Sequence, residues 1–332
     1  MQGSYQVNAR LTLYNLKRKM NGGKQMSKYV IETRNLTKKY GDKKSVSNLN
    51  IHVQKNRIYG LLGRNGAGKT TTMKMLLGLT SATSGEIRIF GKNISGNEKR
   101  ILPRIGCLIE SPGFYPNLTG TENLQIFASL RGVPRKNAIR EALDLVGLEY
   151  KDKKLFSQYS LGMKQRLAIA LAVMHDPEVL ILDEPINGLD PIGIAEVRKF
   201  IRSLCDVKGK TILISSHILS EIAVLADDIG IIDNGTLLEE MSLDELEEKN
   251  KKYILFTVSE TTQAARILTS DFGTKDFKVA DNHNIYLYDT SLSVASINRK
   301  FINNGIDVFE AHLCEDTLED YFKRVTGGEG IA

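Results

Sequence analysis

The sequence predicts an α/β fold organised around a parallel sheet, and three short stretches carry this prediction. The apolar run Ile58–Leu62 is followed by a glycine-rich loop and then by an apolar helical pattern. A second apolar run, Val179–Leu182, ends in two carboxylates, and the run "TILISS" ends in His217. Polar groups after several buried strands are typical of an open α/β sheet, because the carboxyl ends of its strands share one edge where ligands bind.

The composition is that of a globular protein with room for one large domain and a smaller one: 332 residues, 42% hydrophobic and 25% charged. No apolar run approaches the roughly 18 residues that span a bilayer. We therefore expect a soluble chain, or one attached to a membrane through another protein. The three cysteines, Cys107, Cys205 and Cys314, are far apart and lack metal-ligand spacing, which favours a reduced, cytosolic protein.

The N-terminal 25 residues hold most of the net charge and are predicted to be a non-native or disordered extension. The formal net charge is +6, and residues 1–25 contain five basic side chains and no acid. The remainder is nearly neutral, so we expect no nucleic-acid partner. The stretch "GGKQM" can be encoded as GGA GGA AAA CAA ATG, a ribosome-binding site before a start codon. Either Met26 is the true start or the segment is a genuine flexible tail, and mass spectrometry of the native N-terminus separates the two.

The strongest local motif is "GRNGAGKT", which matches the phosphate-loop pattern G-x-x-x-x-G-K-[ST] between a strand and a helix. Its glycines let backbone N–H groups wrap a phosphate at a helix N-terminus. Lys69 is expected to neutralise the β- and γ-phosphates of ATP, and the Thr70 hydroxyl to bind Mg²⁺. A glycine-rich turn without a ligand is the alternative. The predicted nucleotide-binding residues of the loop are Gly63, Arg64, Asn65, Gly66, Ala67, Gly68, Lys69, Thr70 and Thr71.

The second apolar strand supplies the carboxylates that such a loop needs. Asp183 is placed to hold Mg²⁺ through water, and Glu184 to polarise the attacking water as a general base. His217 ends the third strand. A lone histidine there is usually only a satisfied polar group, but beside two strands that end in phosphate chemistry a γ-phosphate contact is favoured.

The stretch "YSLGMKQRLAIALA" just before the carboxylate strand resembles the signature of ABC transporter ATP-binding subunits, normally L-S-G-G-Q. Ser160 and Gly162 match it, whereas Tyr159, Leu161 and Met163 depart from it. The resemblance covers residues 29 to about 240 and implies a RecA-like core with an antiparallel β subdomain and a helical subdomain.

The resemblance also implies partners. Ser160 and Gly162 would open a helix that grips ATP bound to a second copy, which gives a head-to-tail homodimer with two shared ATP molecules. Asp190, in "GLD", matches the loop that crosses this interface, and Tyr40 matches the aromatic residue that stacks on adenine. A separate polytopic permease is implied, which would place the chain peripherally on the cytoplasmic face of the membrane.

Glu110, in "IGCLIESPGFY", falls where the family usually has a glutamine that contacts Mg²⁺ and the attacking water. An acid there, together with "SLGMKQR" and "SSHILSEI", resembles the bacitracin-resistance and lantibiotic-immunity exporters. A carboxylate binds Mg²⁺ more strongly than an amide but repels the γ-phosphate when no metal is present. The alternative is a surface acid that caps the turn at residues 111–113.

Three regions are therefore expected: the ATP-binding domain 29–240, its helical subdomain at about 111–160, and an accessory α+β lobe at 241–332. In the subdomain, "TGTENLQIFASLRG" and "RKNAIREALDLVGL" have helical spacing. In the lobe, "KYILFTVS" and "NHNIYLYD" are predicted strands, and "ASINRKFINNG" and "TLEDYFKRVTGG" are predicted helices. The lobe is predicted to be structural or dimer-stabilising, with a regulatory role open. The predicted function is an ATP-hydrolysing exporter subunit, with a bacitracin- or lantibiotic-like cargo implied by resemblance alone. Rival interpretations are an ABC ATPase acting on ribosomes or DNA, a module that binds ATP without hydrolysis, which Glu184 argues against, and an importer.

Overall fold

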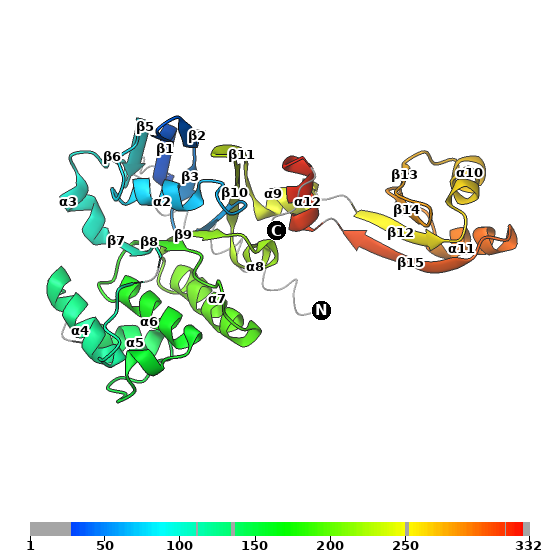
Figure 1. The fold of residues 1–332 in the computed structure, drawn as a ribbon. Coiled ribbons are helices and arrows are strands. Elements are labelled where there is room, and N and C mark those ends of the chain that lie inside the picture. Colours follow the sequence, from blue (N-terminus) through cyan, green and yellow to red (C-terminus); the bar gives the residue numbers. More distant parts are fainter. Residues whose placement is uncertain (1–27, 111, 134–136, 250–251, 316, 328–332) are drawn as a thin grey trace, which may run out of the picture.

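The computed structural model describes residues 28–110, 112–133, 137–249, 252–315 and 317–327. The predicted N-terminal extension and Met26 lie outside these residues. A large body carries a small lobe that stands apart on one side (Figure 1). Within the described ranges, no helix is both long enough and apolar enough to cross a membrane.

The body is built on a six-stranded sheet in the order β11-β10-β4-β9-β8-β7. All neighbouring pairs are parallel except β10 and β11. Every residue of β4 and β9 is buried, as expected for strands covered on both faces. The strands span Ile58–Leu62 (β4), Ile105–Leu108 (β7), Val179–Asp183 (β8), Thr211–Ser216 (β9), Asp228–Asp233 (β10) and Thr236–Ser242 (β11).

Alternate residues of each strand enter two separate cores, because successive side chains point to opposite faces. Leu180 and Leu182 pack with the helices α6, α7 and α8, and Ile181 packs with α2. These helices span Lys69–Leu76 (α2), Leu161–Val173 (α6), Pro191–Asp206 (α7) and Leu219–Leu225 (α8). The predicted α/β class is confirmed. The phosphate loop, Glu184 and His217 follow strands at one edge of the sheet, and Asp183 is the last residue of β8 at the same edge.

An antiparallel sheet covers α2 from above (Figure 1). It consists of β1 (Tyr29–Tyr40), β2 (Lys43–Leu49), β3 (His52–Gln54), β5 (Ser84–Ile89) and β6 (Lys92–Asn93). Glu240 fastens it to the body: its carboxylate accepts a hydrogen bond from the Tyr59 hydroxyl at 2.8 Å and lies 2.7 Å from His52 Nδ1. Burial, followed by the neighbouring Glu240 charge, raises the pKa of Tyr59 well above its usual value. The charged stretch after β6 forms two short helices, α3 (Glu98–Ile101) and η1 (Leu102–Arg104).

The helical subdomain comprises α4 (Gly120–Arg131), α5 (Ala138–Leu145), η2 (Phe156–Gln158) and the start of α6. Thr119 and Glu122 form a reciprocal capping box at the start of α4, and Gly132 ends it in the left-handed conformation. Both helical patterns predicted between residues 111 and 160 therefore form helices.

The lobe folds around its own core, which includes Phe256, Ile297 and Phe301. Its sheet has the order β13-β14-β12-β15, with two helices on one face. The elements are β12 (Lys252–Val258), α10 (Thr261–Asp271), β13 (Phe277–Val279), β14 (Asn284–Leu287), α11 (Val294–Asn303) and β15 (Val308–Glu315). The sequence patterns predicted β12, β14 and α11 but missed α10, β13 and β15.

The packing differs from the expected domain boundary near residue 240. The helices α9 (Leu243–Lys249) and α12 (Leu318–Val325) fall in the range predicted for the lobe, yet both pack in the core of the body. Tyr321 and Phe322 of α12 are buried in the cluster that contains Ile222 and Leu225 of α8. The lobe is thus inserted between α9 and α12, and a pattern of apolar residues cannot reveal which core a helix joins.

Candidate active site

The loop between β4 and α2 has a backbone that only glycine fits at several positions. Gly66 and Gly68 have φ values of +82° and +107°, which side chains with a Cβ rarely adopt. A Cβ on Gly63 would lie 2.3 Å from the carbonyl oxygen of Ile232. Among the described side chains none caps the start of α2, so its first N–H groups are available to a phosphate.

Lys69 is buried, with an exposed fraction of 5%. Its ammonium donates to the carbonyl of Gly63 at 2.6 Å and to that of Arg64 at 3.2 Å, and it lies 3.4 Å from Glu184 Oε1. The ammonium is therefore held over the concave side of the loop, where it can meet a phosphate.

Asp183 accepts a hydrogen bond at each carboxylate oxygen. The Thr70 hydroxyl donates to Oδ2 at 2.7 Å, and the Ser215 hydroxyl donates to Oδ1. Ser215 also accepts from the backbone N–H of Glu184 at 2.9 Å. This buried serine on β9 was not predicted. The only signal was that "TILISSH" stops being apolar two residues before His217, and the contact depends on the β8–β9 register, which pairs Asp183 with Ser215.

Glu184 lies between a lysine and a histidine. Its Oε2 is 2.6 Å from His217 Nδ1, and its Oε1 is the atom near Lys69. Glu184 has a φ of +49°, so the chain turns sharply as it leaves β8. This arrangement points a carboxylate at the position that a phosphate would occupy above the loop.

A cavity of about 640 Å³ joins these groups to Tyr40, which is half exposed at the end of β1. Its rim is basic because Lys43, Lys44 and Arg64 line it. Thr71, whose hydroxyl lies 3.0 Å from that of Ser45, lines it as well. Phosphate-binding groups, the carboxylate of Glu184 and an aromatic ring thus face one space large enough for a nucleotide.

Glu110 lies outside this cavity. Its carboxylate is 2.6 Å from the ammonium of Lys74 on α2, and its side chain is 68% exposed. This hydrogen bond raises the pKa of Lys74. The metal-contact role predicted for Glu110 stays a prediction, and Ser111, at the start of the predicted turn, lies outside the described residues.

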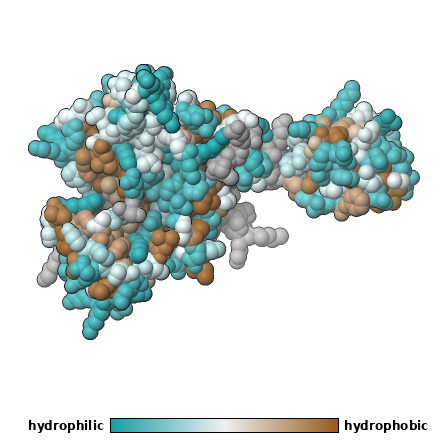
Figure 2. Space-filling model, viewed as in Figure 1, coloured by the Kyte–Doolittle hydropathy of each residue, from teal (hydrophilic) through white to brown (hydrophobic). Residues whose placement is uncertain are grey.

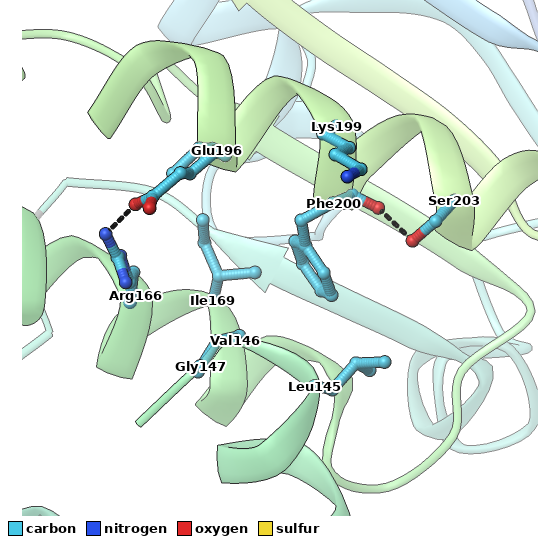
Figure 3. Close-up of a pocket in the computed structure, with 10 residues that line it drawn as sticks. Leu145, Val146, Gly147, Arg166, Ile169, Glu196, Lys199, Phe200 and Ser203 are labelled. Carbon is cyan, nitrogen blue, oxygen red and sulfur yellow. Dashed lines mark hydrogen bonds and ion pairs between the residues drawn. The ribbon is translucent and has the colours of Figure 1, made fainter. Parts of the chain in front are cut away.

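Ser160, Gly162 and Asp190 line a different hollow, away from the phosphate loop of their own chain. The Ser160 hydroxyl accepts from the Met163 N–H at 3.3 Å and so caps α6, and Asp190 caps α7 in the same way through Gly193 at 3.1 Å. Behind them lies a mostly apolar pocket between α5, α6 and α7, bridged by an Arg166–Glu196 ion pair (Figure 3).

Comparison with known proteins identifies the family. Residues 46–187 match the ABC transporter family. The chain is 54% identical over 304 residues to the bacitracin transport ATP-binding protein BcrA of Enterococcus faecalis, covering 92% of this chain and 98% of the relative. The chain belongs to the ABC transporter ATP-binding proteins. The predicted family is confirmed, and as a member of it this ABC protein binds and hydrolyses ATP.

Other relatives place this ABC protein in a subgroup and delimit its parts. It is 46% identical over 230 residues to the lantibiotic transport ATP-binding protein SrtF of Streptococcus pyogenes, covering 68% of this chain and 98% of SrtF. SrtF is thus too short to contain both the body and the lobe. A solved ATP-binding subunit of an ABC transporter is 28% identical, with a TM-score of 0.59, over 66% of this chain and 92% of that chain.

Proposed function

We propose that this ABC protein is the ATP-hydrolysing subunit of an exporter that removes a bacitracin- or lantibiotic-like peptide through a separate membrane permease. The observation that supports hydrolysis best is the convergence of Lys69, Glu184 and His217 on one cavity, with Asp183 held behind it by Thr70. The cargo is inferred from the names of the bacitracin and lantibiotic relatives.

Each residue of the cavity has a role in this proposal. The N–H groups of the loop and Lys69 bind the β- and γ-phosphates of ATP. Glu184 takes a proton from the attacking water, and His217 orients Glu184 and contacts the γ-phosphate. Tyr40 stacks on the adenine. Because Glu184 and His217 directly follow buried strands, these two groups need little rearrangement when the nucleotide binds.

Thr70 and Asp183 fit a magnesium ion, since hydroxyl and carboxylate oxygens are its preferred protein ligands and these two lie 2.7 Å apart beside the loop. Mg²⁺ would supply positive charge against the phosphates. Ser215 holds the carboxylate from its other side, so Asp183 keeps a fixed orientation toward that position.

The signature residues supply the second half of the proposed site. Ser160 and Gly162 do not reach the phosphate loop of their own chain, so they can contact ATP only if a second copy binds head to tail. A solved cassette with the same fold, 24% identical and with a TM-score of 0.58, is described as dimeric. We therefore infer a homodimer with two shared ATP molecules, each held between one copy's loop and the other's α6.

The permease is expected to meet the region that follows Glu110. Tyr115, five residues on, is half exposed, and the Glu110–Lys74 pair links this segment to α2 of the phosphate loop. A movement of α2 on ATP binding can thus pass to this surface. Such an assembly places the chain peripherally on the cytoplasmic face of a membrane.

The proposal is tested by expressing the chain with its candidate permease in a peptide-sensitive bacterium. Resistance to bacitracin or a lantibiotic should rise, and Lys69→Ala should abolish the rise because the triphosphate loses its balancing charge. Lys99→Ala, an exposed lysine on α3, is the matched control. Resistance that survives Lys69→Ala would refute the proposal, and so would a purified wild-type chain that copurifies with no polytopic protein.

A further inference from the structure

The strand β15 forms an exposed edge of the lobe's sheet (Figure 1). It pairs with β12 along one side, and no other described strand pairs with it. At eight residues it is as long as any strand of the lobe. An edge of this length presents a row of backbone N–H and C=O groups that a further strand can bind.

The side chains of β15 are exposed in an ordered pattern. Phe309 and Leu313 are 67% and 57% exposed, and Ala311 lies between them. Ala311 and Leu313 share a face, whereas the pairing with β12 shifts register between Glu310 and Val308 and leaves Phe309 without a partner residue. On the other face the side chains of Glu310 and His312 are 57% and 47% exposed. The lobe therefore carries two large apolar side chains, an acid and a histidine along its open edge.

The order of these residues suits a second copy of the same strand. Along an edge strand, every second residue points its backbone N–H and C=O groups away from the sheet. When two such strands pair antiparallel, each residue lies opposite a residue whose backbone groups have the same orientation. If β15 pairs symmetrically with β15 of a second copy, the two-fold axis must therefore pass at a residue and not between two residues. The candidate centres in the exposed stretch are Glu310, Ala311 and His312.

Only one of these centres gives complementary neighbours. A centre at Glu310 sets it against the partner's Glu310, and a centre at His312 sets it against the partner's His312. A centre at Ala311 sets Glu310 against the partner's His312 and brings Phe309 near the partner's Leu313, with the small side chains of the two alanines at the axis. Apolar contacts and pairs of an acid with a hydrogen-bonding base across two strands stabilise a sheet, whereas like charges directly opposite each other destabilise it.

We propose that β15 is a homodimerisation edge, which pairs antiparallel with β15 of a second copy about Ala311 and joins two four-stranded sheets into one of eight. The contact lies in the lobe, has its own core beneath it and involves no nucleotide-binding residue. It is thus separate from the ATP-dependent contact between two bodies that is inferred under the proposed function. Each of these two proposed contacts can be wrong without the other being wrong.

Charge exchange tests the pairing in the full chain without nucleotide. His312→Glu sets two carboxylates against each other twice per dimer, and Glu310→Lys sets lysine against histidine, so each variant should self-associate about tenfold more weakly than wild type by sedimentation. A mixture of the two variants should restore a dimer, because each lysine then meets a glutamate and each histidine a glutamate. Lys278→Glu, on the opposite edge strand β13, is the control. Unchanged self-association of the single variants, or a mixture no tighter than they are, would contradict the proposal.

Cysteine cross-linking tests the register. In a Cys314→Ser background, which keeps Cys107 and Cys205, one cysteine is added at position 310, 311 or 312. Opposite residues of an antiparallel pair lie about 4.5–5.5 Å apart between Cα atoms, within the range of a disulfide. Oxidation should link the chain most strongly through position 311. A maximum at 310 or 312, no cross-link at all, or a link to the permease in place of a second copy would overturn the proposed pairing.

Discussion

At the scale of single residues, the carboxylate of Glu184 is the proposed general base of hydrolysis. It is held by His217 at 2.6 Å and approached by Lys69 at 3.4 Å. Both neighbours are groups that a γ-phosphate would also contact, so ATP is expected to draw Lys69 away and leave Glu184 free to accept a proton. The backbone of Glu184 is fixed at the same time by Ser215.

Glu184→Gln should bind ATP normally but turn it over about 10²–10⁴-fold more slowly, because an amide can keep the hydrogen bond to His217 but cannot take the proton. It should also trap an ATP-bound dimer that is visible by size-exclusion chromatography. Glu178→Gln, at the opposite end of β8, is the control. If Glu184→Gln hydrolyses ATP at the normal rate, the base lies elsewhere, and His217 would be examined next.

The phosphate loop and its two carboxylates could be predicted because phosphate chemistry demands those residue types at fixed spacing. Ser215 and Lys74 could not, since their contacts with Asp183 and Glu110 join elements that are far apart in the sequence. Such contacts depend on strand register and helix packing. The proposed reacting groups are therefore easier to predict from the sequence than the groups that hold them in place.

At the scale of elements, α12 shows how the end of the chain completes the body. Leu318, Tyr321 and Phe322 form one buried face at helical spacing, and this face packs on α8, which follows His217. The last turn of α12 lies near the phosphate loop, where Arg64 Nη2 is 3.5 Å from the carbonyl oxygen of Thr326. The helical pattern was predicted, but its partner lies about a hundred residues earlier in the sequence.

Phe322→Ala should lower the free energy of unfolding by about 3–5 kcal/mol, the usual effect of emptying a fully buried phenylalanine site. Urea denaturation measures this loss, and hydrogen exchange should show α12 and α8 losing protection before β4. Glu319→Ala, whose side chain is 60% exposed on the same helix, is the control and should change little. Equal stability of both variants would mean that α12 does not support the body.

At the scale of the whole molecule, the body and the lobe present different surfaces for assembly. Apolar and polar groups are mixed over the visible faces of both (Figure 2). The body offers the phosphate-loop and signature hollows, and the lobe offers β15. SrtF is long enough for the body but not for the lobe. We therefore expect the body to suffice for ATP hydrolysis, and the proposed role of the lobe lies in how copies assemble.

Coupling to a permease concerns the whole assembly, and Glu110 is the residue on which it can be tested. Glu110→Gln restores the usual side chain of the family and should keep most ATPase activity, whereas Glu110→Ala should lose more. Both should weaken peptide resistance more than hydrolysis in solution, because the segment after Glu110 leads to the proposed permease surface. Lys74→Gln is the matched control, since it breaks the same ion pair and leaves the carboxylate in place.

The dependence on magnesium separates the two roles of Glu110. A carboxylate near the γ-phosphate repels it unless metal screens the charge, so wild type and Lys74→Gln should need more free Mg²⁺ for half-maximal turnover than Glu110→Gln. If Glu110 only forms an exposed ion pair with Lys74, that pair contributes about 0.2–1 kcal/mol to stability. In that case Lys74→Gln and Glu110→Gln should behave alike. The measurement is ATPase rate against free Mg²⁺ for the four proteins, paired with resistance in cells. Identical curves with unaltered resistance would leave Glu110 as a surface acid that pairs with Lys74 and takes no part in transport.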